Sequence, residues 1–156
     1  SGIEAAKSVV KVISIPPTNT DEIEKEINLI FSPLEVEAGI SYIQFEQAIR
    51  QVMDYYMSLV KNEQGIELAI ERLDLIEKYQ NKIQARNMHD LMRTQEARFL
   101  LKQCQLTAMA VKERRESGRS TSRRSDFPNL NPEYNGKCLA LWEESGQHKL
   151  AFIPAP

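Results

Sequence analysis

Apolar residues recur every three or four positions through three long segments, and this spacing restricts the possible folds more than any other feature. The segments cover residues 41 to 61, 62 to 80 and 88 to 117. Ser41 and Gln44 stand at capping-box spacing before the first of them. Amphipathic helices of this length bury their apolar stripes against one another, so the sequence predicts a mainly α fold, a helical bundle with three principal helices.

Shorter patterns flank this bundle on its N-terminal side. Residues 3 to 14 have helical spacing, and Pro16-Pro17 then stops the helix because proline lacks an N–H group. Thr20 is placed to cap a second short helix, which Pro33 ends. The chain opens on Ser1-Gly2 without a methionine, and we therefore expect the start to be a cut end.

The composition changes after the third long segment. Residues 118 to 136 are rich in serine, arginine, asparagine and glycine, which favour turns, and they predict a loop. The apolar runs at 138–144 and 148–154 then flank Ser145-Gly146-Gln147 and predict a small C-terminal β-hairpin. The expected organisation is a linker helix or the end of a preceding domain at 1–15, the bundle at 16–117, and the loop with its hairpin at 118–156.

Length and composition place the chain among ordinary intracellular proteins. Its 156 residues suffice for one core, and a net charge of −2 excludes a general affinity for polyanions. Cys104 and Cys138 lack metal-ligand spacing, which favours reduced thiols. No apolar run reaches the roughly 20 residues that span a bilayer, and no signal peptide is evident. We expect a cytoplasmic protein without direct membrane insertion.

Motifs of a self-contained active site are missing from the sequence. There is no glycine-rich phosphate loop, no nucleophile elbow and no zinc-binding HExxH. His89 and His148 lie in different segments; we expect His89 to cap or pack a helix and His148 to sit in a solvated turn. The fragment is therefore predicted to be inactive by itself, with no catalytic, cofactor-binding or metal-binding residue.

Residues 112–124 form the one strong local charge anomaly. They carry six basic and two acidic side chains, in contrast to the acidic remainder of the chain. Arginines at the C-terminal end of a helix also complement its dipole, which is a purely structural reason for their presence. Three interpretations stay open: a structural or interdomain role, a protein partner, or binding of nucleic acid or phosphate. The alternative function is thus an independent helical module that binds an acidic protein or nucleic acid through this segment.

The exit of the third long segment carries a recognisable signature. Arg114-Arg115-Glu116-Ser117 is followed by Arg124-Ser125-Asp126-Phe127-Pro128. This order resembles the C-terminal region of the succinate dehydrogenase/fumarate reductase flavoprotein family, where a helix ends in R-x-E-S-R-G and R-x-D-[YF]-P follows. Residues 49–56 and 63–78 are similar to helices of that family, and the segment 87–93 with Glu96 is most similar to its adenylylsulfate reductase α subunit branch.

The resemblance implies that the chain is the C-terminal helical domain of an FAD-dependent oxidoreductase. It implies FAD in the parent protein but no cofactor in this fragment, and a structural role in docking. The partners it implies are the FAD-binding and capping domains of the parent chain and an iron–sulfur electron-transfer subunit, with no nucleic acid. The residues it assigns to interdomain docking are Arg115, Glu116, Ser117, Arg124, Asp126 and Phe127.

Overall fold

The computed structural model describes residues 7, 9, 10, 19–118, 123–144 and 147–155. The chain divides into two compact units, Ser1–Phe31 and Ser32–Pro156, and each is described by itself. The helix expected at 3–14 lies almost wholly outside the described residues. The same holds for the turn expected at Ser145 and Gly146.

The first unit contributes helix α2, Thr20–Phe31. The expected cap was one residue too late, because Thr20 already belongs to the helix and the Asn19 side chain accepts the backbone N–H of Glu22 at 3.4 Å. Asn19 takes this place since a helix leaves its first N–H groups without internal acceptors. No residue of α2 is buried, and Ile23 and Ile27 on its apolar stripe are about half exposed.

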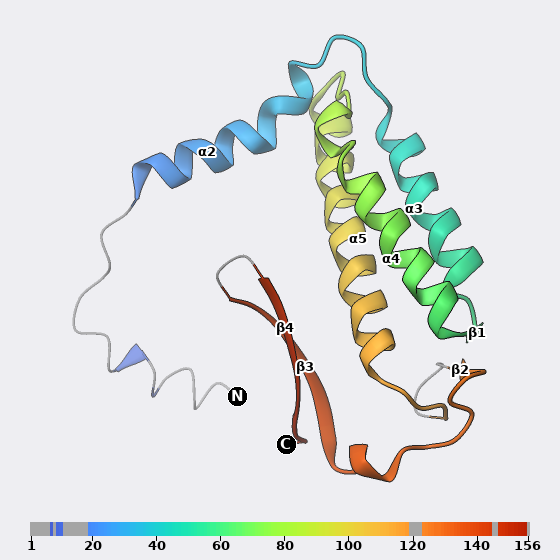
Figure 1. Ribbon diagram of the computed structural model, residues 1–156. Helices are drawn as coiled ribbons and strands as arrows, with labels where there is room; N and C mark the ends of the chain where they lie inside the picture. The colour runs from blue at the N-terminus through green and yellow to red at the C-terminus, as the bar shows by residue number, and fades with distance from the viewer. Residues whose placement is uncertain (1–6, 8, 11–18, 119–122, 145–146, 156) are drawn as a thin grey trace. The chain divides into compact units, whose positions relative to one another are not determined.

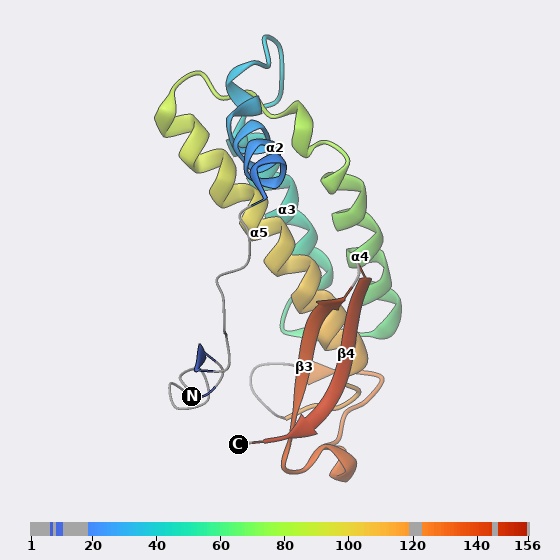
Figure 2. The same ribbon diagram turned by 90° about the vertical axis from the view of Figure 1, so that its left-hand side faces the viewer.

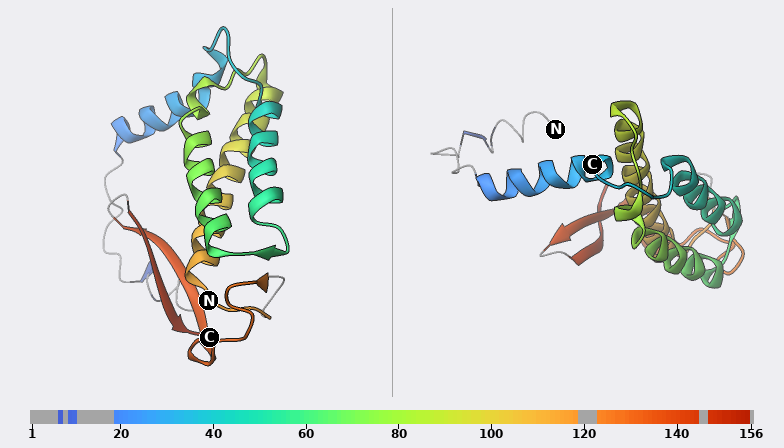
Figure 3. Two further views of the ribbon diagram at one scale, coloured as in Figure 1. Left: turned by 45° about the vertical axis from the view of Figure 1, so that its right-hand side comes forward. Right: turned by 90° about the horizontal axis from the view of Figure 1, so that it is seen from above.

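The second unit contains the predicted bundle of three helices, each antiparallel to the next along the chain (Figure 1). They are α3, Tyr42–Tyr56; α4, Glu63–Glu77; and α5, Met88–Glu113. Figure 3 shows the three lying side by side from two further directions. Buried side chains of these helices, together with Ile83 between α4 and α5, form one core, whose members are Phe45, Ile49, Val52, Ala69, Leu73, Ile83, Ala97, Leu101, Cys104 and Ala108. The predicted fold class is confirmed.

Side-chain caps set where these helices begin. Ser41 and Gln44 form the predicted capping box, with Ser41 Oγ accepting from Gln44 N at 3.2 Å. Asn62 accepts from Gly65 N at 2.8 Å, and Asn87 accepts from Asp90 N at 2.9 Å. Gly65 therefore lies inside the first turn of α4.

Two helices end earlier than their periodicity suggested. α3 ends at Tyr56 because Val60–Lys61 leave the helix and form strand β1. α5 ends at Glu113 because Arg114 is extended, which turns the following residues back toward the bundle. A local apolar pattern indicates that a helix exists better than it indicates the residue at which the helix ends.

Short elements connect the helices. A 3₁₀ helix, η1 (Ser32–Leu34), contains the helix-ending Pro33, and another, η2 (Gln80–Lys82), lies between α4 and α5. An isolated parallel bridge pairs Ile40 with Ile83 between these connections. Gly39 permits that close approach, since a methyl group there would stand 2.3 Å from the carbonyl oxygen of Lys82.

The region after α5 contains more structure than a plain loop. Strand β2, Arg123–Arg124, pairs in parallel with β1, and η3, Pro132–Tyr134, is a 3₁₀ helix. The predicted hairpin follows as β3, Lys137–Glu144, and β4, Gln147–Pro154, in antiparallel register (Figure 2). The sequence predicted the hairpin but missed the β1–β2 pair, because two-residue strands leave no periodic signal.

Candidate docking site at the end of the long helix

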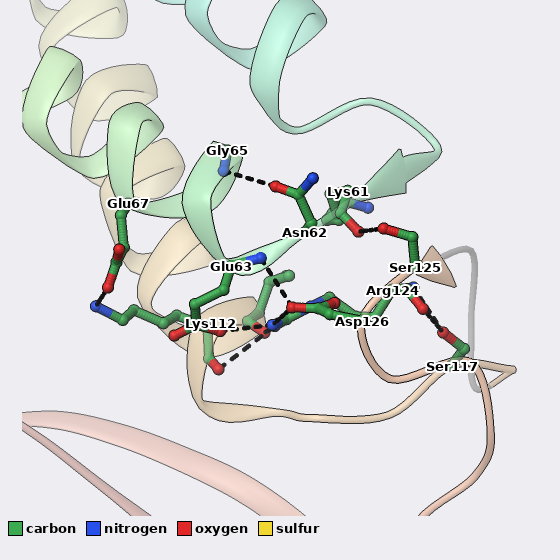
Figure 4. Close-up of polar contacts among 11 residues, drawn as sticks. Lys61, Asn62, Glu63, Gly65, Glu67, Lys112, Ser117, Arg124, Ser125 and Asp126 are labelled. Atoms are coloured by element: carbon green, nitrogen blue, oxygen red, sulfur yellow. Dashed lines mark hydrogen bonds and ion pairs between the residues drawn. The ribbon is translucent and has the colours of Figure 1, made fainter.

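The six residues predicted to dock the bundle gather where the chain leaves α5. Arg114 has extended backbone angles, and Glu116 and Ser117 follow as buried residues. The chain then returns at Arg123–Arg124 to pair with the residues just before α4. Sequence positions about 60 residues apart are thereby brought into direct contact (Figure 4).

Arg124 is the centre of this arrangement, and its side chain is fully buried. Its Nε donates to Asp126 Oδ1 at 2.9 Å, and its Nη2 donates to Asp126 Oδ2 at 2.7 Å and to Glu63 Oε2 at 2.6 Å. Nη1 donates to the backbone carbonyl of Val111 at 2.8 Å, near the end of α5. One guanidinium fork thus connects the end of one helix to the start of another, a geometry that lysine cannot reproduce.

Backbone contacts hold Arg124 in place. Arg123 N and Ser125 N donate to the carbonyl oxygens of Leu59 and Lys61 at 3.2 and 2.9 Å. Arg124 N donates to Ser117 Oγ at 2.6 Å, and that hydroxyl also lies 3.1 Å from the carbonyl oxygen of Arg124. We call Arg124, Glu63, Asp126 and Ser117 the Arg124 network.

Asp126 also caps helix α4, because its Oδ2 accepts the backbone N–H of Glu63 at 2.8 Å. The hydrogen bonds from Arg124 are the main reason that the pKa of Asp126 falls to about 2, and the Glu63 backbone N–H adds to the effect. Hydrogen bonds to the carboxylates of Asp126 and Glu63 raise the pKa of Arg124 above its ordinary value. Burial, together with the nearby charge of Arg124, lowers the pKa of Lys61.

Glu116 forms a second anchor beside the network. Its side chain is 1% exposed, and Arg114 Nε donates to Glu116 Oε1 at 2.7 Å. Glu116 Oε2 accepts the backbone N–H of Asn131 at 3.0 Å, which ties down the loop before η3. A buried carboxylate is tolerable here because both of its oxygens have donors.

Arg115 and Phe127 are the outward part of the predicted docking segment. The Arg115 guanidinium lies 5.9 Å from the centre of the Phe127 ring, and the Arg124 guanidinium lies 5.0 Å from the same centre. Arg115 is exposed and Phe127 is half-buried. Glu116, Ser117 and Arg124 thus form hydrogen bonds with other residues of this chain. Arg115 and Phe127 are the residues of the segment that a partner could contact.

Glu63 was missed by sequence reasoning, although it completes the ion pairs of Arg124. Its only signal was an acidic residue in the first turn of a helix, which the helix dipole already explains. Its role appears only once β1 and β2 are paired. Asp126 and Phe127 were among the predicted docking residues because they belong to the Asp-Phe-Pro signature.

A second polar cluster lies between α4, α5 and β4, in a cleft of about 530 Å³. Lys102 Nζ lies 2.9 Å from His148 Nε2, and the buried Gln105 amide donates to Asp74 and Glu77 at 3.0 Å each. The expectation of a solvated turn for His148 is wrong: the residue lies within strand β4, is half-buried, and attaches the hairpin to α5.

The other histidine of the chain, His89, belongs to helix α5. His89 is exposed and its Nδ1 stands 3.7 Å from Asp90 Oδ1. Among the described residues, no group of three or more His, Cys, Asp or Glu side chains is arranged to hold a metal ion. None of the helices in the described part combines the length and apolar character required to cross a membrane.

Comparison with solved structures defines the class of domain. Two adenylylsulfate reductase structures, one described as a covalent sulfite adduct and one from Archaeoglobus fulgidus, superpose with TM-scores of 0.87 and 0.85 at 20% identity. Each covers 97% of this chain, which spans 27% of theirs. Mycobacterium smegmatis Sdh1 in complex with UQ1 superposes with a TM-score of 0.79 at 18% identity. That alignment covers 99% of this chain and 27% of the Sdh1 chain. The fold is that of a helical domain within much longer proteins.

Sequence comparison supplies the family. Residues 46–154 match the family described as fumarate reductase flavoprotein C-term, and the chain belongs to that family. With its helical bundle, it is a C-terminal helical domain of a flavoprotein in that family. A Methanocaldococcus jannaschii protein, described as an uncharacterized FAD-dependent oxidoreductase, is 24% identical over 152 residues. That alignment covers 97% of this chain and 28% of the relative.

Proposed function

We propose that this chain buttresses the flavin-binding part of a longer, cytoplasmic FAD-dependent oxidoreductase of the adenylylsulfate reductase-like branch. The observation that carries the proposal is the alignment of nearly the whole chain with about a quarter of flavoproteins in the family. FAD and the reacting substrate bind elsewhere in that polypeptide. An iron–sulfur electron-transfer subunit is the expected partner of the assembled enzyme.

The docking segment is Arg115, Glu116, Ser117, Arg124, Asp126 and Phe127, divided into two roles. The Arg124 network and Glu116 fix the path of the chain after α5. Arg115 and Phe127 then present a planar cation beside an aromatic ring to a neighbouring domain. A guanidinium held in this way loses little conformational freedom when it bridges carboxylates or carbonyl oxygens of a partner.

The alternative, an independent module that binds an acidic protein or nucleic acid through residues 112–124, is the weaker proposal. Lys112 pairs with Glu67 at 2.9 Å, Arg114 with Glu116, and Arg124 with Glu63 and Asp126. Three of the basic side chains in this segment are therefore neutralised within the chain. The local excess of positive charge in the sequence does not translate into a basic patch of equal size.

The test compares the isolated chain with the longer flavoprotein. Purified alone, residues 1–156 should be helical and free of flavin absorbance; tight FAD binding by this fragment would overturn the proposal. In the longer protein, Arg115→Glu should lower the fraction of purified enzyme that retains FAD, because the bundle would no longer dock. Arg72→Glu, an exposed arginine on α4, is the matched control and should leave that fraction unchanged.

A further inference from the structure

The β3–β4 hairpin has two different faces. Leu139, Leu141 and Phe152 point to one face, together with His148 and Leu150, because side chains alternate along each strand. This inner face is occupied: His148 contacts Lys102, Leu150 lines the cleft beside α5, and the Phe152 ring stacks on Tyr134 at 4.2 Å. Figures 1 and 2 show the ribbon running beside the lower end of α5.

The opposite face is apolar from Cys138 to Trp142 and becomes polar toward the tip of the hairpin, where Glu144, Gln147 and Lys149 lie. Its cross-strand pairs are Cys138 with Ile153 and Ala140 with Ala151, followed by Trp142 beside Lys149. Trp142 is 43% exposed, Ile153 is 46% exposed, and Cys138 is also exposed. The two alanines leave a shallow position between larger side chains. We call this surface, with Cys138, Ala140, Trp142, Ala151 and Ile153, the outer hairpin face.

We infer that the outer hairpin face is an interdomain contact, covered by the preceding flavin-binding region of the same longer polypeptide. This inference rests on the proposed function. An exposed apolar patch on a folded domain commonly marks an interaction surface. Here one side packs on α5, and the other still exposes a tryptophan and an isoleucine.

The size of the face distinguishes a contact within one chain from a contact between free molecules. The outer hairpin face extends over five positions per strand, 138–142 and 149–153, and is therefore about 17 Å long and about 10 Å wide, or roughly 170 Å². A stable complex of free proteins needs about 800 Å² from each partner. The outer hairpin face is too small for that, whereas a covalently linked partner at a high effective concentration needs much less area.

Continuity with the docking segment indicates the same partner. Asn131 is fixed by Glu116, Tyr134 of the following 3₁₀ helix stacks on Phe152, and β3 begins three residues later. The chain between Phe127 and β3 is therefore restrained at Asn131 and Tyr134, and Arg115 lies beside the Phe127 ring. One neighbouring domain contacts both this pair and the outer hairpin face.

The two cysteines provide a direct test. Cys138 lies on the outer hairpin face, whereas Cys104 is buried in the bundle core, where desolvation raises its pKa and suppresses its reactivity. We expect Cys138 in the isolated chain to react readily with a small alkylating reagent. In the flavin-loaded longer protein the reaction should be at least ten-fold slower. Cys104 should stay unreactive in both, which verifies that each sample is folded.

Equal alkylation rates of Cys138 in the two proteins would overturn the inference. Protection that depends on protein concentration would assign the face to a second copy and overturn it too. Bound flavin in the longer protein is measured separately, so loss of the proposed function is recognised independently of the thiol result. As a second arm, Trp142→Arg should restore Cys138 reactivity in the longer protein, whereas Tyr55→Arg, which alters an exposed aromatic residue on α3, should not.

Discussion

Arg124→Met should destabilise the bundle far more than the same change at its neighbour Arg123. The two arginines are adjacent in β2, but Arg124 is 1% exposed and Arg123 is exposed. Methionine at 124 would fill much of the volume while removing every side-chain donor. Glu63 and Asp126 would lose their cation, and the Val111 carbonyl would lose its donor.

The magnitude follows from burial on the two sides of the ion pairs. Breaking a fully buried pair by removing one partner costs about 3–5 kcal/mol. Glu63 and Asp126 keep about 32% and 26% of their side chains exposed, so water compensates part of their loss. We therefore expect the lower end of that range, about 3 kcal/mol in the free energy of unfolding. Arg124→Lys should recover only part of it because an ammonium cannot bridge both carboxylates in the same fork.

Urea unfolding followed by circular dichroism at 222 nm measures this difference. With a slope of about 2 kcal/mol per molar urea, the midpoint of Arg124→Met should fall by about 1.5 M relative to the unmodified chain. Arg123→Met should change the free energy by less than about 0.5 kcal/mol, as expected for a surface position. Equal midpoints for the two methionine variants would refute the argument that the buried arginine holds this end of the bundle.

Three further perturbations test separate parts of the structure. Because the folded-state pKa of Asp126 is depressed to about 2, the stability it contributes is present above about pH 4 and is lost as pH falls toward 2. Acid titration should show a loss of at most about 2 kcal/mol in this window, absent in Asp126→Asn. Ser41→Ala should lower stability by about 1 kcal/mol in thermal unfolding, whereas Ser41→Asp, which also caps, should not. His148→Lys should place two cations together at Lys102 and alter the fluorescence of Trp142, the single tryptophan, while His148→Gln keeps an acceptor and should not.

The hairpin and the helix starts were predictable because their signals are local. Ser41, Asn87 and the apolar spacing each act within a few residues, where caps and periodicity determine structure. The cap of α2 was misplaced by one residue, since Asn19 and Thr20 are both competent caps and local sequence does not choose between them.

The sequence by itself determined three amphipathic helices, a terminal hairpin and the Arg-Glu-Ser and Asp-Phe-Pro signature of the family. Only the tertiary structure decided that Arg124 would be buried between Glu63 and Asp126, or that His148 would reach Lys102. Helical spacing is written into neighbouring residues, whereas these pairs join positions 61 and 46 residues apart. Such contacts form only when packing brings distant segments together, and that packing divides the docking segment into a buried anchor and an exposed surface.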